Sequence, residues 1–139
     1  MNKRLSQLRS RLNQTQQQIQ ELLEDLQGRS PLLPASLYQL QRKCGKPNCR
    51  CTKGQLHQTT VLSYRGQPRK QTITPPQEQI ESLKKVTDEY RRVRKARAQL
   101  VRLQRQLLDI VDQMQTLRVA QGERDLEKIR SASSRSTRR

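Results

Sequence analysis

The sequence has no Trp and no Phe, and Tyr occurs only three times. Hydrophobic residues make up 31% of the 139 residues. A chain with so few large apolar side chains cannot bury enough surface to fold as one large globule. It can still bury a narrow seam between two helices, or close a small module around a metal ion. We therefore expect helices and a small metal-stabilised module.

Long apolar runs are also missing, and no stretch approaches the roughly 20 residues that a membrane-spanning helix requires. The N-terminus is charged and then rich in Gln, without the apolar segment of a secretory leader. We therefore expect a cytoplasmic protein with no membrane partner. In that compartment, cysteines are more often metal ligands than disulfide partners.

Acidic residues are scarce, with 12 Asp and Glu against 29 Lys and Arg, and the net charge is +17. None lies between Asp25 and Glu78, and none between Tyr90 and Leu108. A surface of one sign is what phosphate contact requires, because each neutralised phosphate releases condensed counterions. The alternative for each basic run is an ordinary solvated surface. The predicted nucleic-acid contacts are Arg42, Lys43, Lys46, Arg50, Lys53, Arg65, Arg69, Lys70, Arg91, Arg92, Arg94 and Lys95.

The shortage of aromatic residues also distinguishes between nucleic acids. Proteins that bind single strands, and many RNA-binding modules, stack bases on aromatic side chains. Only Tyr38, Tyr64 and Tyr90 are present here, so duplex DNA held through its phosphates is the favoured ligand. The turn at residues 65–67 could enter a groove, where Arg and Gln contact base edges. The alternative is an exposed turn without that role.

All three cysteines and the only histidine lie in one short segment with the spacing Cys-x4-Cys-x-Cys-x5-His. The residues are Cys44, Cys49, Cys51 and His57. Cysteine and histidine are preferred zinc ligands, and four of them complete a tetrahedral shell. The sequence therefore predicts a zinc knuckle. Two alternatives remain: a reduced basic loop whose histidine belongs to the following strand, and a thiol-redox role, which no Cys-x-x-Cys pair supports.

Residues 1–28 have the apolar spacing of a coiled-coil helix. Steps of three and four residues join Leu5 to Leu26, with Thr15 as the one polar interruption. Pro31 prevents the helix from continuing.

A second, longer stripe predicts a coiled-coil helix over residues 75–121, which Gly122 ends. Residues 122–139 then form a basic tail. The two helices leave the same central module and can pack antiparallel. Because the first helix is the shorter one, the stripe around Leu107 to Leu117 would lie uncovered. We expect a homodimer through this part of the long helix.

Residues 36–74 form the central module. Segments 36–43, 59–64 and 69–73 are rich in residues that favour strands, and they predict a small three-stranded antiparallel sheet. The expected fold is therefore mostly α. An N-terminal coiled-coil helix and a long C-terminal helix flank a small zinc-knuckle and β-hairpin module.

The motif Cys-Gly-Lys-x-x-Cys-x-Cys occupies residues 44–51 and is followed by His57 and Tyr64. In these residues the chain resembles an uncharacterised family of small bacterial proteins that are often encoded beside mobile genetic elements. The resemblance implies a coiled-coil arm, a knuckle, a hairpin and a long helix. It also implies a role in transposition or recombination, with a transposase or recombinase as partner.

These observations together predict a non-enzymatic DNA-binding accessory protein that assists a transposase or recombinase. The single histidine, the absence of acidic residues near the cysteines and the lack of a Gly-rich phosphate loop argue against an enzyme. Two other functions remain open. One is an RNA-binding component of a ribonucleoprotein, and the other is a coiled-coil adaptor for an acidic protein partner.

Overall fold

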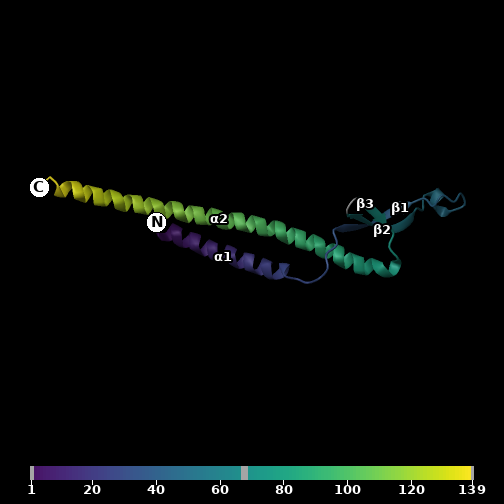
Figure 1. Ribbon diagram of the computed structural model, residues 1–139. Helices are drawn as coiled ribbons and strands as arrows, with labels where there is room; N and C mark the ends of the chain where they lie inside the picture. Colours follow the sequence, from purple (N-terminus) through teal and green to yellow (C-terminus); the bar gives the residue numbers. More distant parts are fainter. Residues whose placement is uncertain (1, 67–68, 139) are drawn as a thin grey trace. The chain divides into compact units, whose positions relative to one another are not determined.

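The computed structural model describes residues 2–66 and 69–138 (Figure 1). Two compact units are present: residues up to 27 and from 96 onward form a helical unit, and residues 28–95 contain the sheet. The predicted fold, mostly α with a long C-terminal helix and a small antiparallel sheet, is confirmed. The elements are α1 (Asn2–Leu26), β1 (Ala35–Arg42), the 3-10 helix η1 (Arg50–Lys53), β2 (His57–Arg65), β3 (Lys70–Ile73), the 3-10 helix η2 (Gln77–Gln79) and α2 (Ile80–Ser136).

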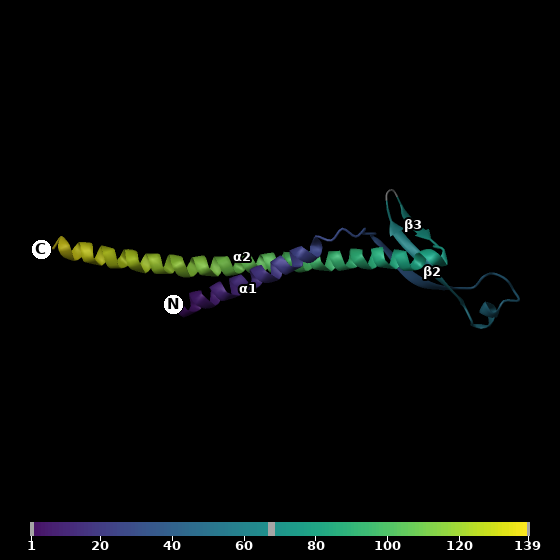
Figure 2. The ribbon, with the colours of Figure 1, turned by 90° about the horizontal axis from the view of Figure 1, so that it is seen from below.

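In the helical unit, α1 runs alongside the middle of α2, and the C-terminal end of α2 extends beyond it (Figure 2). Two side-chain hydrogen bonds fix the pairing. Arg4 donates to Gln113 at 3.1 Å, and Gln106 donates to Thr15 at 3.1 Å. Because the partner's number falls as the α1 residue number rises, the two helices are antiparallel, as the sequence predicted.

The seam between these helices is built from the heptad residues. Leu8, Leu103 and Ile110 are buried in it. Thr15 is buried as well, and its hydroxyl accepts the hydrogen bond from Gln106. A buried hydroxyl without a partner would cost about 1–3 kcal/mol, so this bond makes the polar interruption compatible with a continuous seam.

The prediction that the stripe around Leu107 to Leu117 lies uncovered is wrong. Ile110, near its centre, has no exposed surface, because the antiparallel α1 reaches as far as Gln113. Among the described residues, no helix combines the length and the apolar content that crossing a membrane requires. Exposed apolar residues of α2 lie on another face and farther along the helix: Leu108, Val111, Val119, Leu126 and Ile129.

Helix α2 continues past Gly122 to Ser136, so the predicted end at residue 121 is wrong. One glycine inside a helix costs about 1 kcal/mol relative to alanine, and the backbone hydrogen bonds on both sides of it outweigh this cost. Side-chain bonds also span the glycine, since Gln121 donates to Asp125 and Arg124 donates to Gln121, both at 2.9 Å. Most of the predicted basic tail is therefore helical.

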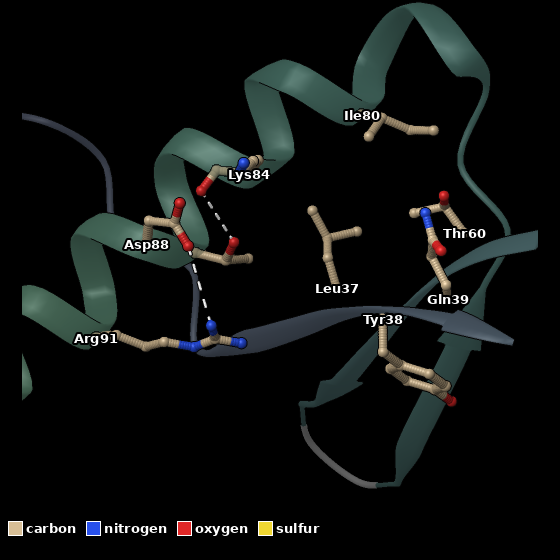
Figure 3. A pocket seen from close by; sticks show the side chains of 9 residues that line it. Leu37, Tyr38, Gln39, Thr60, Ile80, Lys84, Asp88 and Arg91 are labelled. Atoms are coloured by element: carbon tan, nitrogen blue, oxygen red, sulfur yellow. Dashed lines mark hydrogen bonds and ion pairs between the residues drawn. The ribbon is translucent and has the colours of Figure 1, made fainter.

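The sheet has the strand order β1-β2-β3 with both pairs antiparallel, which confirms the predicted hairpin module. The register places Leu37, Leu62 and Ile73 opposite one another, on one face. Figure 3 shows Leu37 pointing from β1 toward α2, whereas Tyr38 points to the opposite side. On the face toward α2, Leu62 is buried and Ile73 is 45% exposed, and Val61 is buried on the face of Tyr38, with which it pairs. The sheet therefore buries residues on both of its faces.

The chain before β1 is also fixed to α2, because the N–H of Leu33 donates to the carbonyl of Val86 at 3.1 Å. A hollow of about 330 Å³ lies between β1 and the start of α2 (Figure 3). Its lining includes Leu37 and Ile80, with the buried Thr87 on the helix. These contacts hold the sheet against the helix within this unit.

Gly66, which follows β2, lies against the ring of Tyr64. A Cβ atom at Gly66 would clash with the ring of Tyr64, which folds back over it. A larger residue at Gly66 would therefore require the end of the Tyr64 side chain to move. The other two residues of the predicted turn, Gln67 and Pro68, lie outside the described residues.

Candidate metal centre

The sheet register brings together the two ends of the cysteine-rich loop. Arg42, the last residue of β1, pairs with His57, the first residue of β2. Cys44 follows Arg42 by two residues and therefore starts close to His57. The histidine belongs to strand β2 and also to the Cys/His cluster, so its place in a strand does not remove it from the site.

A short 3-10 helix carries Cys51 into the loop. It begins after Cys49, and Cys51 within it is completely buried. Thr52 closes this turn, because its hydroxyl and its N–H both donate to the Cys49 carbonyl, at 2.7 Å and 3.1 Å. Gly45 and Gly54 have φ values of 82° and 102°, a backbone region that favours glycine. The glycines that mark turns in the sequence therefore shape this loop.

The four predicted ligand atoms, which belong to Cys44, Cys49, Cys51 and His57, all lie within 4.8 Å of one another. The sulfurs of Cys44 and Cys51 are 3.5 Å apart, and the Cys49 sulfur lies 3.0 Å from Nε2 of His57. The backbone N–H of Cys44 donates to the Cys51 sulfur at 3.3 Å. All three cysteines are free thiols. The predicted ligand set is thus close enough to hold one metal ion.

The surroundings of the thiols give them different acidities. The pKa of Cys49 is lowered to about 6, chiefly by a hydrogen bond from the backbone N–H of Cys51. Side-chain hydrogen bonds with Cys44 and His57 act in the same direction. The N–H of Lys46 favours the thiolate of Cys44, but hydrogen bonds with the other two thiols outweigh it and raise the pKa of Cys44. Because the thiolate is the metal-binding form, Cys49 is the thiol most ready to bind.

The predicted nucleic-acid contacts are all exposed side chains. Five belong to the end of β1 and the metal-binding loop, three to the hairpin, and four to α2. In that order they are Arg42, Lys43, Lys46, Arg50 and Lys53; Arg65, Arg69 and Lys70; and Arg91, Arg92, Arg94 and Lys95.

Two of the helical residues are engaged with acids. Arg91 forms an ion pair with Asp88 at 3.9 Å, and Arg92 donates two hydrogen bonds to Glu89 at 2.6 Å and 3.0 Å. Each acid precedes its arginine by three residues and therefore shares its helix face. The segment without acidic residues begins only at Tyr90. Asp88 and Glu89 lie just before it, so the charge pattern of the sequence did not identify them as partners of the two arginines.

The family model of a domain of unknown function, DUF6788, matches residues 5–92, which is more than half of the chain. The chain belongs to the DUF6788 family. The match spans the metal-binding loop, all three strands and most of α1. It therefore includes the complete Cys/His cluster. No curated protein and no solved structure matches the chain.

Within the DUF6788 region, three predicted contacts from three different elements converge. Arg65 of β2, Lys70 of β3 and Arg91 of α2 line one hollow of about 450 Å³. Ser63 and Tyr90 line it too, and sequence reasoning did not select them. No charge run or motif marks these two residues, and only the folded arrangement of sheet and helix brings them to the site.

Proposed function

We propose that the protein is a non-enzymatic, zinc-dependent DNA-binding accessory protein whose contacting surface is the metal-binding loop and the β2–β3 hairpin. One observation carries the proposal. The sheet unit combines a Cys/His cluster with exposed basic side chains, and it contains no acidic residue before Glu78. A rigid surface of one sign is suited to a polyanion.

Zinc is the metal that the ligand set fits best. Zinc–sulfur bonds of about 2.3 Å place two sulfurs of a tetrahedral shell roughly 3.8 Å apart. The sulfurs of Cys44 and Cys51 are 3.5 Å apart, close to that separation. Three thiolates and an imidazole suit zinc, whereas Mg²⁺ and Ca²⁺ take oxygen ligands. Bound zinc would contribute folding free energy to this loop.

The positive charge of the loop exceeds what its metal centre needs. A Zn²⁺ ion with three thiolates and a neutral imidazole carries a single net negative charge. The same loop exposes Lys43, Lys46, Arg50 and Lys53. Most of this charge therefore remains available to an external partner.

Duplex DNA is the proposed polyanion because the unit offers no stacking platform of several aromatic rings. Tyr38 is 40% exposed, the ring of Tyr64 lies over Gly66, and Tyr90 is only partly exposed. The proposed partner enzyme, a transposase or recombinase, rests on the resemblance of residues 44–51 to proteins encoded beside mobile elements.

The test is a competition titration of the zinc-loaded protein with duplex DNA, duplex RNA and single strands of equal length at about 150 mM salt, near the ionic strength of the cell. We expect duplex DNA to compete best, with an affinity that falls steeply as salt increases. Preference for RNA would contradict the proposal and favour a ribonucleoprotein component. Failure to bind any nucleic acid, with retention on an acidic protein surface, would favour an adaptor.

A further inference from the structure

The hollow that joins the hairpin to α2 has an unusual charge distribution. Arg65, Lys70 and Arg91 line it from three elements, and no described residue of its lining is acidic. All three side chains are exposed. The positive charge at this point is therefore gathered by the fold, since residues 65 and 91 lie far apart in the chain.

The pairing of β2 with β3 places two of these cations directly opposite each other. Arg65 and Lys70 are cross-strand partners, and like charges in such positions destabilise a hairpin. Nothing in the described lining offsets this repulsion. An anion held between the two side chains would turn an unfavourable pair into a favourable one.

The ion pair of Arg91 is weak enough to let its side chain turn toward the same anion. Its ion pair with Asp88 is long, at 3.9 Å, and both side chains are about half exposed, at 54% and 55%. Exposed pairs of this kind contribute little to stability. Figure 3 shows Arg91 with Asp88 beside the neighbouring hollow. A guanidinium bound bidentately to a phosphate makes a stronger contact.

Neutral donors complete the lining. Ser36 and Ser63 are opposite one another in the β1–β2 register, and both line the hollow. Their hydroxyls, together with that of Tyr90, can donate to oxygen atoms. We propose that this hollow holds one backbone phosphate of a bound duplex, shared by the three cations. The inference rests on the proposed function and deepens it, because it makes the hairpin and helix runs parts of one site.

A shared phosphate has a measurable consequence. If the three cations hold one phosphate, changing all three to Gln lowers the slope of log affinity against log salt by about 0.9. Three independent contacts would lower it by roughly 2.7. Each single variant, Arg65→Gln, Lys70→Gln or Arg91→Gln, is expected to lose on the order of tenfold in affinity. The triple variant is expected to lose much less than the product of the three losses.

The matched control removes three positive charges elsewhere, at Lys128, Arg130 and Arg135, all exposed on α2. It should keep the wild-type slope. Circular dichroism checks that all variants fold, and Lys70→Gln should not lower the melting temperature, because it removes a like-charge pair. Affinity for a labelled duplex is measured by anisotropy from low to moderate salt.

The dependence of duplex affinity on salt tests whether the three cations share one phosphate. A slope reduced by about one phosphate in the triple variant supports the shared site. A reduction of roughly three phosphates, or none beyond the control, overturns it while leaving DNA binding intact. A wild-type protein that binds no duplex overturns the inference and the proposed function together. Displacement of the duplex by inorganic phosphate, beyond that by chloride of equal ionic strength, would assign the hollow to a free anion and overturn the backbone contact.

Discussion

Cys51 is completely buried, whereas Cys44, whose sulfur lies 3.5 Å away, is exposed. Burial of one ligand beside an exposed one means that the loop folds around Cys51. The spacing of the cysteines was enough to predict which residues form the cluster. It could not predict which of them lies inside, because that depends on the 3-10 turn that begins after Cys49.

Changing Cys51 to Ala should abolish metal binding and loosen the loop. The side chain is small, so the packing loss is modest, and the main effect is loss of a zinc site that contributes folding free energy. Metal analysis of protein purified without chelator should give about one zinc per wild-type chain and almost none in the variant, with faster hydrogen exchange near His57. The exposed Gln41→Ala serves as the control and should keep its zinc. Wild-type protein without zinc would contradict the assignment.

Cys49 should be the most reactive thiol after the metal is removed. Its pKa is lowered to about 6, so it is largely a thiolate at neutral pH, whereas Cys44 has a raised pKa and stays protonated to higher pH. Alkylation by iodoacetamide, followed by mass spectrometry across pH, should show Cys49 reaching half its maximal rate near pH 6. Since a lowered pKa marks a stabilised thiolate, reactivity is lost as pH falls below that value.

The histidine variant provides the comparison for this titration. His57→Ala removes one of the hydrogen bonds to the Cys49 sulfur, so the midpoint for Cys49 should move to higher pH. Zinc added to the wild-type protein should protect all three thiols. A Cys49 midpoint near 8.5, the value of an ordinary cysteine, would show that its surroundings do not favour the thiolate.

At the scale of elements, apolar spacing predicted both helices, and their departure from one central module predicted the antiparallel pairing, but neither predicted the end of α2. Heptad spacing is a strong signal because many residues repeat it, whereas Gly122 is a single residue with a weak effect. The three strands were also predictable from composition. Their register was not, and the register is what sets Arg42 opposite His57 and Arg65 opposite Lys70.

Two glycines should respond in opposite ways to substitution by alanine. Gly122 lies inside α2 with nothing near its missing Cβ atom, so Gly122→Ala should stabilise the helix by about 0.5–1 kcal/mol. Gly54 also has open space, but its φ is 102°, so Gly54→Ala should strain the metal-binding loop. Thermal unfolding followed by circular dichroism measures the first effect, and zinc affinity measures the second. A lower melting temperature for Gly122→Ala, or an unchanged zinc affinity for Gly54→Ala, would contradict this explanation.

At the scale of the whole molecule, charge and apolar surface act against each other. The net charge of +17 opposes self-association, because identical chains repel. The exposed apolar residues of α2 favour it, and several of them, including Leu126 and Ile129, lie beyond the residues that α1 contacts. At physiological ionic strength, salt largely screens the repulsion between exposed charges that are more than about 8 Å apart. Self-association should therefore strengthen with salt, while DNA binding weakens.

The homodimer was expected through the stripe around Leu107 to Leu117, whose centre α1 covers. We now place the expected contact at Leu126 and Ile129, and sedimentation equilibrium at micromolar concentration tests it. Leu126→Glu with Ile129→Glu should give a monomer, because each places a charge in the apolar contact, whereas the exposed Ser131→Glu should leave the dimer intact. Ile110→Glu should instead disrupt the pairing of α1 with α2, since Ile110 has no exposed surface. A loss of helical circular dichroism therefore distinguishes that variant from the other two. Wild-type protein that remains a monomer at every salt concentration would rule out this interface.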